Sequence, residues 1–149
     1  MSEVSPYLRG AIAALWVIWG AVHVLAGFIV IGADAAGGMA AIGDAVDPAA
    51  TAGEYHPVLG AILNQHGWNL LCAGVATIVG GLFVWFGSQS ALWLTALVGG
   101  LFDLGYFVFI DLGGFANFIP GTLMTMVSGG AIVITAYVYA GSPRRPAKG

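Results

Sequence analysis

The sequence predicts an all-α integral membrane protein, a four-helix bundle in which every helix crosses the bilayer. Of its 149 residues, 59% are hydrophobic and only 7% are charged, and the mean hydropathy is +0.92. A soluble domain carries about 25% charged residues, so this chain has too few to cover a water-facing surface. Four apolar runs are each long enough to cross a hydrocarbon core of about 30 Å. The length suits one membrane domain over residues 1–149.

The first predicted span covers residues 10–31 and contains a single titratable side chain, His23. This run is longer than the ~7–15 residues of a signal-peptide core, so we expect a retained span. Residues 32–53 are rich in Gly, Ala and Asp and contain no Lys or Arg. That composition predicts a large, loosely ordered loop between the first and second spans.

The other three spans are predicted over residues 59–86, 91–110 and 120–140. The third contains one charged residue, Asp103, and the fourth opens on Pro120, which the first turn of a helix tolerates. The turn between the second and third spans is only a few residues long, so these two helices should be antiparallel neighbours.

The positions of the basic residues predict the topology. Arg9 precedes the first run, and Arg144, Arg145 and Lys148 follow the last one in a basic tail, residues 142–149. Short cytoplasmic segments carry the excess of Lys and Arg, so both termini should be cytoplasmic. Two cytoplasmic termini require an even number of spans, in agreement with the four counted independently. The expected location is the cell membrane, as a multi-pass protein with its large first loop outside.

Each predicted span contributes a polar side chain to one layer in the outer half of the bilayer. At a rise of ~1.5 Å per residue, the second helix reaches this level near Asn69, with His66 several Å closer to the outer surface. A charge at the bilayer centre costs at least ~2.5–3.5 kcal/mol, so the Asp103 carboxyl group must be protonated, paired, hydrated or bound to a ligand. His23 is its expected partner. The candidate ligand-binding residues are His23, His66, Asn69, Asp103 and Ser128.

Weaker candidates lie in the loops and among the remaining side chains. Glu54, His56 and Asp111 are predicted to be solvated or to form the rim of a site. Cys72 is expected to be a small buried hydrophobic residue. The single cysteine excludes an intrachain disulfide and a multi-cysteine metal site. Trp68 is predicted at the outer membrane interface. The inner half of the bilayer and its interface belt are predicted to hold Trp16, Trp19, Trp85 and Trp93.

Three classes of function remain open. We favour a non-enzymatic or accessory membrane protein with a polar intramembrane site. In a purely structural role, the same polar side chains would only form hydrogen bonds between the helices. The first alternative is a quinone- or haem-linked redox protein, in which His23 and His66 could ligate one haem only if they reached the same depth. The second is a small proton-coupled transporter or a channel-like oligomer.

The sequence assigns no catalytic residue, metal or cofactor. It lacks the serine elbow, the paired-histidine zinc motif and the glycine-rich nucleotide loop. Its four scattered Lys and Arg residues make no footprint for nucleic acid. The expected partners are therefore the lipid bilayer and, for so small a bundle, a second copy of the chain or a partner membrane subunit.

Overall fold

The computed structural model describes residues 4–43 and 46–141, so the predicted basic tail lies outside the described residues. The chain is all-α, and four of its helices are long and apolar enough to cross a membrane. These are α1 (Pro6–Val30), α3 (Pro57–Trp85), α4 (Gln89–Tyr106) and α5 (Leu123–Gly141). A π-helical turn, Phe107–Asp111, extends α4, and another, Phe118–Thr122, leads into α5.

Local sequence signals set the starts of these helices. Proline occupies the first turn of both α1 and α3, where its missing N–H is not needed. The Ser88 hydroxyl caps α4 by accepting a hydrogen bond from the Ala91 amide at 3.2 Å. Pro120 lies just before α5, and the preceding Ile119 is extended (φ −118°, ψ 125°), as the residue before a proline usually is.

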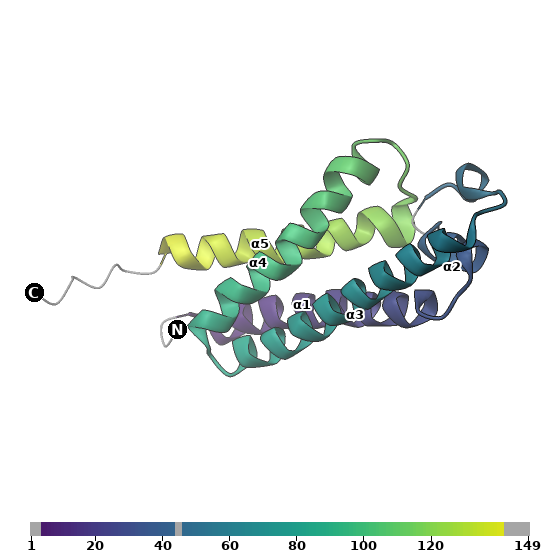
Figure 1. Cartoon of the computed structure of the whole chain (residues 1–149). Coiled ribbons are helices and arrows are strands. Elements are labelled where there is room, and N and C mark those ends of the chain that lie inside the picture. Colours follow the sequence, from purple (N-terminus) through teal and green to yellow (C-terminus); the bar gives the residue numbers. More distant parts are fainter. Residues whose placement is uncertain (1–3, 44–45, 142–149) are drawn as a thin grey trace, which may run out of the picture.

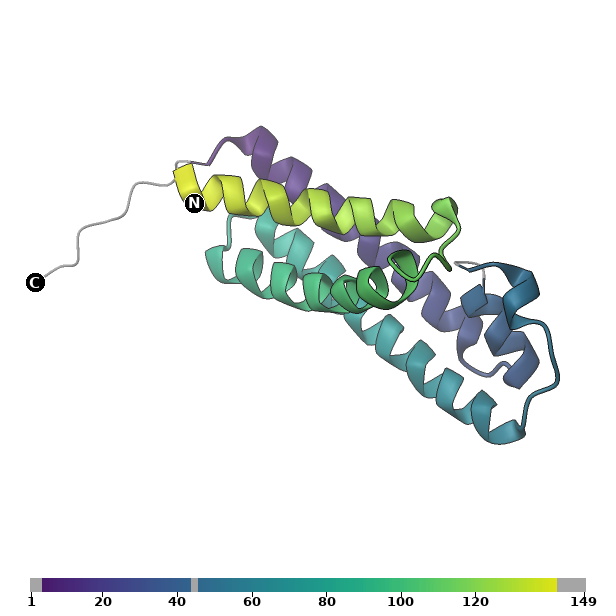
Figure 2. The ribbon, with the colours of Figure 1, turned by 90° about the horizontal axis from the view of Figure 1, so that it is seen from above.

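The four long helices form an antiparallel bundle (Figures 1 and 2). Helix α1 packs against α3 and α5, and α4 packs against the same two helices. The two ends of the described chain lie together at one end of the bundle, while the α1–α3 and α4–α5 connections lie at the other end (Figure 1). Both ends of a chain lie on the same side of a membrane when the number of spans is even, and four candidate spans meet that condition. Which end faces the cytoplasm stays a prediction.

The contact between α1 and α3 is a direct approach of two backbones. A Cβ atom placed on Gly20 would lie 2.6 Å from the carbonyl oxygen of Gly74, and one on Gly74 would lie 2.6 Å from the Gly20 oxygen. One on Gly27 would likewise lie 2.6 Å from the Gly67 oxygen. Small residues at such points allow helices to pack closely in lipid, where the hydrophobic effect does not drive association.

The expectation of a loosely ordered first loop is wrong. Residues 35–42 form a helix, α2 (Ala35–Ile42), and Pro48–Thr51 forms a 3-10 turn. Asp34 caps α2, because its carboxylate accepts a hydrogen bond from the Gly37 amide at 2.7 Å. The helix packs against α1 and α3, so tertiary contacts stabilise a segment too short to be helical alone.

The first connection is also tied to the second. Val46 forms an isolated antiparallel bridge with Ala116, and the Asn117 side-chain amide donates a hydrogen bond to the Val46 carbonyl oxygen at 2.9 Å. Segments separated by about 70 residues in the sequence are therefore held together at one end of the bundle. Asn117 acts here as a structural link.

The centre of the bundle contains large side chains from α1. Trp16 and Trp19 are both 0% exposed and pack with their rings edge to face, 6.1 Å between centroids. Neither ring is available to anchor the chain at a lipid interface, because both side chains point into the bundle. Their depth in the inner half stays a prediction. The other three tryptophans are exposed on the surface of the bundle. Cys72 is exposed as well, so its predicted burial is wrong.

The topology can be tested with two reporters. A reporter fused after Lys148 should be active only as a cytoplasmic probe, because the basic residues at both termini favour the cytoplasmic side. One inserted at Gly53, an exposed residue in the α1–α3 connection, should be active only as an external probe. Activity on the opposite side at either position would contradict the topology.

Candidate functional site

A cavity of about 340 Å³ lies among the helices, near the end that carries the two long connections. Its wall is mostly apolar, and its polar side chains include His23 from α1, His66 from α3 and Asp103 from α4. The last residues of α2, the π-helical turn before α5 and the start of α5 complete the wall. The full lining is Val22, His23, Leu25, Ala26, Ile29, Val30, Ala41, Ile42, His66, Leu70, Asp103, Tyr106, Pro120, Gly121, Met124 and Thr125. The volume and character suit a small organic molecule.

The Asp103 carboxylate is buried at this cavity with 6% of the residue exposed. Its Oδ2 atom accepts a hydrogen bond of 2.8 Å from the indole Nε1–H of Trp19. The Ser128 hydroxyl lies beside the same carboxylate and donates to the backbone carbonyl of Thr125 at 3.1 Å. Donors to the ionised form of a buried carboxylate reduce the cost of its burial. Asp103 is therefore held by α1, with Ser128 of α5 beside it.

His23 is fixed by the same tryptophan. Its ring stacks on the Trp19 ring, with 3.6 Å between centroids and 20° between planes. Its Nδ1 atom lies 2.8 Å from the Trp19 backbone carbonyl oxygen. A carbonyl oxygen can only accept, so Nδ1 carries the proton and Nε2 is the acceptor of the neutral ring. In the described part of the chain, Asp103 is hydrogen-bonded to Trp19 and not to His23.

A second carboxylate lies behind the cavity wall. Asp111 accepts hydrogen bonds from the Thr122 hydroxyl at 2.8 Å and from the Thr125 hydroxyl at 2.7 Å. Thr125 itself lines the cavity, so Asp111 holds a lining residue in place. The structure thus gives Asp111 a role between α4 and α5 that its loop position in the sequence did not suggest.

The structure brings only part of the predicted polar layer to the cavity. His23, His66 and Asp103 line it, whereas Asn69 and Ser128 do not. His66 is on the exposed side of α3. Of the weaker candidates, Glu54 is exposed, and His56 caps α3 by accepting a hydrogen bond from the Val58 amide at 3.2 Å. Neither lines the cavity.

Sequence reasoning missed Trp19 as the residue that connects the site. It lies one helical turn before His23, and side chains four residues apart share a helix face. That spacing was the available signal, but a tryptophan in a membrane span is more typically an interface residue. Thr125 shares a face with Ser128, three residues further on, and was not chosen as a candidate.

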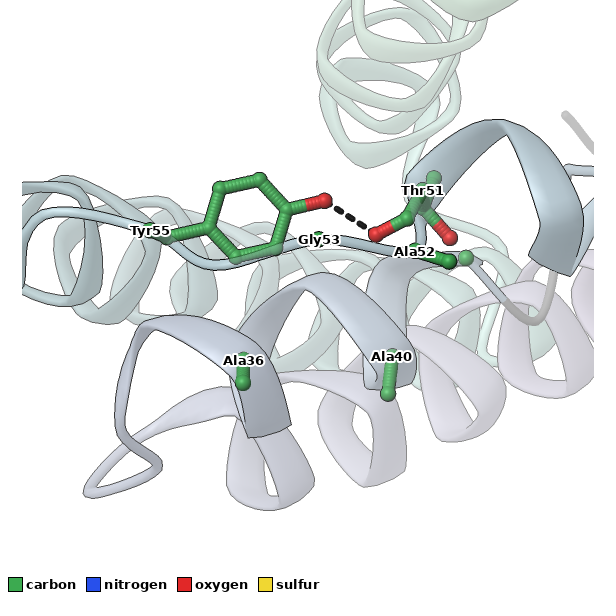
Figure 3. Close-up of a pocket in the computed structure, with 7 residues that line it drawn as sticks. Ala36, Ala40, Thr51, Ala52, Gly53 and Tyr55 are labelled. Carbon is green, nitrogen blue, oxygen red and sulfur yellow. Dashed lines mark hydrogen bonds between the residues drawn. The ribbon is translucent and has the colours of Figure 1, made fainter.

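A smaller hollow of about 270 Å³ lies between α2 and the segment that follows it (Figure 3). It is lined by Ala36, Ala40, Gly43, Thr51, Ala52, Gly53 and Tyr55. The Tyr55 hydroxyl donates a hydrogen bond to the Thr51 carbonyl oxygen across it (Figure 3). This lining has no carboxylate, imidazole or thiol, so we place the candidate site in the larger cavity.

No group of three or more His, Cys, Asp or Glu side chains in the described part of the chain could hold a metal ion. Comparison of the chain with protein-family models, with curated proteins and with solved structures finds no match. The case for a function therefore rests on the geometry of the cavity.

Proposed function

We propose that the chain is a multi-pass, non-enzymatic membrane protein that binds a small, lipid-soluble molecule in the cavity at its polar layer. The observation that supports this proposal is the convergence of His23, His66 and Asp103 on one mostly apolar cavity of about 340 Å³. A few convergent polar groups in an apolar wall are the usual form of a small-molecule site. Polar groups that served only to bond the helices would need no such cavity.

The route to this site is lateral. Leu25 and Ile29 line the cavity, and their residues are 61% and 57% exposed, so this part of the wall is open to the surroundings of the bundle. An apolar molecule dissolved in the bilayer would meet these side chains first. Entry from lipid therefore needs only the displacement of apolar side chains, without passage of the molecule through water.

A variant that fills the cavity tests the proposal. Ala26 lines the cavity, whereas Ala21 lies on the exposed face of the same helix. Purified wild-type protein and Ala21→Phe should both carry a co-purifying small molecule in native mass spectrometry and in solvent extracts. Ala26→Phe should carry much less of it, because its ring occupies the cavity. Equal amounts in all three proteins, or no molecule in any of them, would contradict the proposal.

We expect that His23 and His66 hold no haem as a pair. A haem with two axial histidines from α1 and α3 must insert its ring between those helices. Their backbones touch at Gly27, one helical turn after His23, and at Gly67, which follows His66 directly. A reduced-minus-oxidised spectrum of the purified protein should lack sharp haem bands. Such bands, lost in both His23→Ala and His66→Ala, would show that this expectation is wrong.

A further inference from the structure

The polar atoms at the cavity whose hydrogen-bonding roles are fixed all act as acceptors. The Nδ1 proton of His23 faces the Trp19 carbonyl oxygen, so in the neutral ring Nε2 has the lone pair. The Thr125 hydroxyl gives its proton to Asp111, so its oxygen can only accept from a ligand. The Asp103 carboxylate accepts by its nature and already does so from Trp19. His66 and Tyr106 also line the cavity, and side chains of these types can both donate and accept. A molecule that satisfies the acceptors of His23, Thr125 and Asp103 must bring hydrogen-bond donors.

The carboxylates at the cavity have no Lys or Arg beside them among the described residues. Asp103 lines the cavity, and Asp111 lies behind Thr125, whose hydroxyl donates to the Asp111 carboxylate at 2.7 Å. Among the described residues the one Lys or Arg side chain is Arg9, and it lies beside Gly87 in the α3–α4 turn, away from the cavity lining. Burying a carboxylate without a positive partner is unfavourable. A ligand with a positive charge would supply that partner.

We propose that the cavity takes a lipid-soluble organic amine in its protonated form, which rests on the function proposed above. The apolar body of the amine packs against Leu25, Ile29 and the rest of the apolar wall. Its ammonium group, which only donates, lies against the acceptors of Asp103 and His23. Aliphatic amines have pKa values near ~10.4 in water, so the charged form predominates at neutral pH.

Three probes of one shape separate this inference from the proposed function. They are 4-phenylbutylamine, 4-phenylbutanol and 4-phenylbutyrate, which differ only in a cationic, neutral or anionic head group. Binding to the full chain in lipid nanodiscs is measured by calorimetry at pH 7. We expect the amine to bind at least about tenfold more tightly than the alcohol, a difference of about 1.4 kcal/mol, and the carboxylate to bind most weakly.

Two variants that each remove one negative charge test whether the preference for the amine over the alcohol comes from Asp103. In Asp103→Asn the affinities for the amine and the alcohol should come within about twofold of each other. Asp47→Asn is the matched control, because Asp47 is exposed and caps the 3-10 turn Pro48–Thr51 by accepting from the Ala49 amide. It should keep the full preference. A preference that survives Asp103→Asn would overturn the inference.

The remaining outcomes are equally decisive. If the alcohol binds wild-type protein as tightly as the amine and Ala26→Phe removes both, the inference fails while the cavity stands as a binding site for neutral molecules. If the amine binds equally well to Ala26→Phe, the cavity is not its site. If none of the three probes binds, the amine inference is wrong. The wild-type probe series needs no variant, so a poorly folding Asp103→Asn protein would not prevent the decision.

Discussion

Gly74→Leu is expected to prevent stable packing of α1 on α3. A Cβ atom at this position would lie 2.6 Å from the Gly20 carbonyl oxygen and 2.8 Å from atoms of Val24. Overpacked cores typically lose ~1–3 kcal/mol. The loss here should exceed that range, because the obstacle is a backbone carbonyl that cannot rotate away. We expect no cooperative unfolding transition, or one greatly weakened, when the purified protein is titrated with denaturing detergent.

Gly129→Leu provides the matched control on α5, because a Cβ atom at Gly129 meets nothing within 4 Å. Both variants replace a glycine in a long apolar helix by leucine, so the unfolding transition of Gly129→Leu should lie close to that of the wild-type protein. Gly20→Leu should behave like Gly74→Leu, since the approach is reciprocal. Equal stability of Gly74→Leu and Gly129→Leu would mean that α1 and α3 do not touch as the structure has them.

These glycines show how far the sequence could predict the packing. The seven-residue spacing of Gly20 and Gly27 placed both on the face of α1 that carries His23. The same spacing of Gly67 and Gly74 on α3 was not connected with them. The sequence analysis expected His66 and Asn69 of α3 to contribute to a polar layer shared with the other helices. Instead, small residues face α1 and His66 is exposed, because close backbone contact provides the packing that drives helix association in lipid.

The four long helices could be predicted because the length and polarity of an apolar run decide whether it crosses a bilayer. Helix α2 could not be, since an eight-residue segment rich in Gly and Ala has no such signal. Its stability comes from the Asp34 cap and from contacts with α1 and α3. Those contacts depend on how distant parts of the chain meet, which no local pattern records.

Some residues of the candidate site could be selected from the sequence, and others could not. A carboxylate deep in an apolar span costs too much to be unpartnered, so Asp103 could be selected from the sequence. Asn69 and Ser128 were selected from their estimated depth and their spacing along the helix. Neither quantity says which helix face points into the bundle. The structure leaves both outside the cavity lining and brings in Thr125 in their place. Whether the chosen residues bind a ligand stays a prediction.

The second large effect is expected at Trp19. Trp19→Phe keeps an aromatic ring for His23 to stack on but removes the Nε1–H that donates to Asp103 at 2.8 Å. Leaving a buried acceptor without its donor costs ~1–3 kcal/mol, and more for a charged group. We expect a loss of free energy of unfolding in that range. Trp68→Phe is the control, since Trp68 is 59% exposed and its loss should stay within about 0.5 kcal/mol.

A double-mutant cycle assigns this loss to the Trp19–Asp103 bond. Asp103→Leu alone leaves the buried indole N–H unpaired, and Trp19→Phe alone leaves the carboxylate without its donor. The double variant leaves neither, so it should be at least about 1 kcal/mol more stable than the sum of the single effects predicts. The cycle of Asp103→Asn with His23→Gln should instead be additive within about 0.5 kcal/mol, because Asp103 bonds to Trp19 and not to His23. The reverse pattern, with coupling to His23 and none to Trp19, would restore the direct His23–Asp103 pair that the sequence suggested.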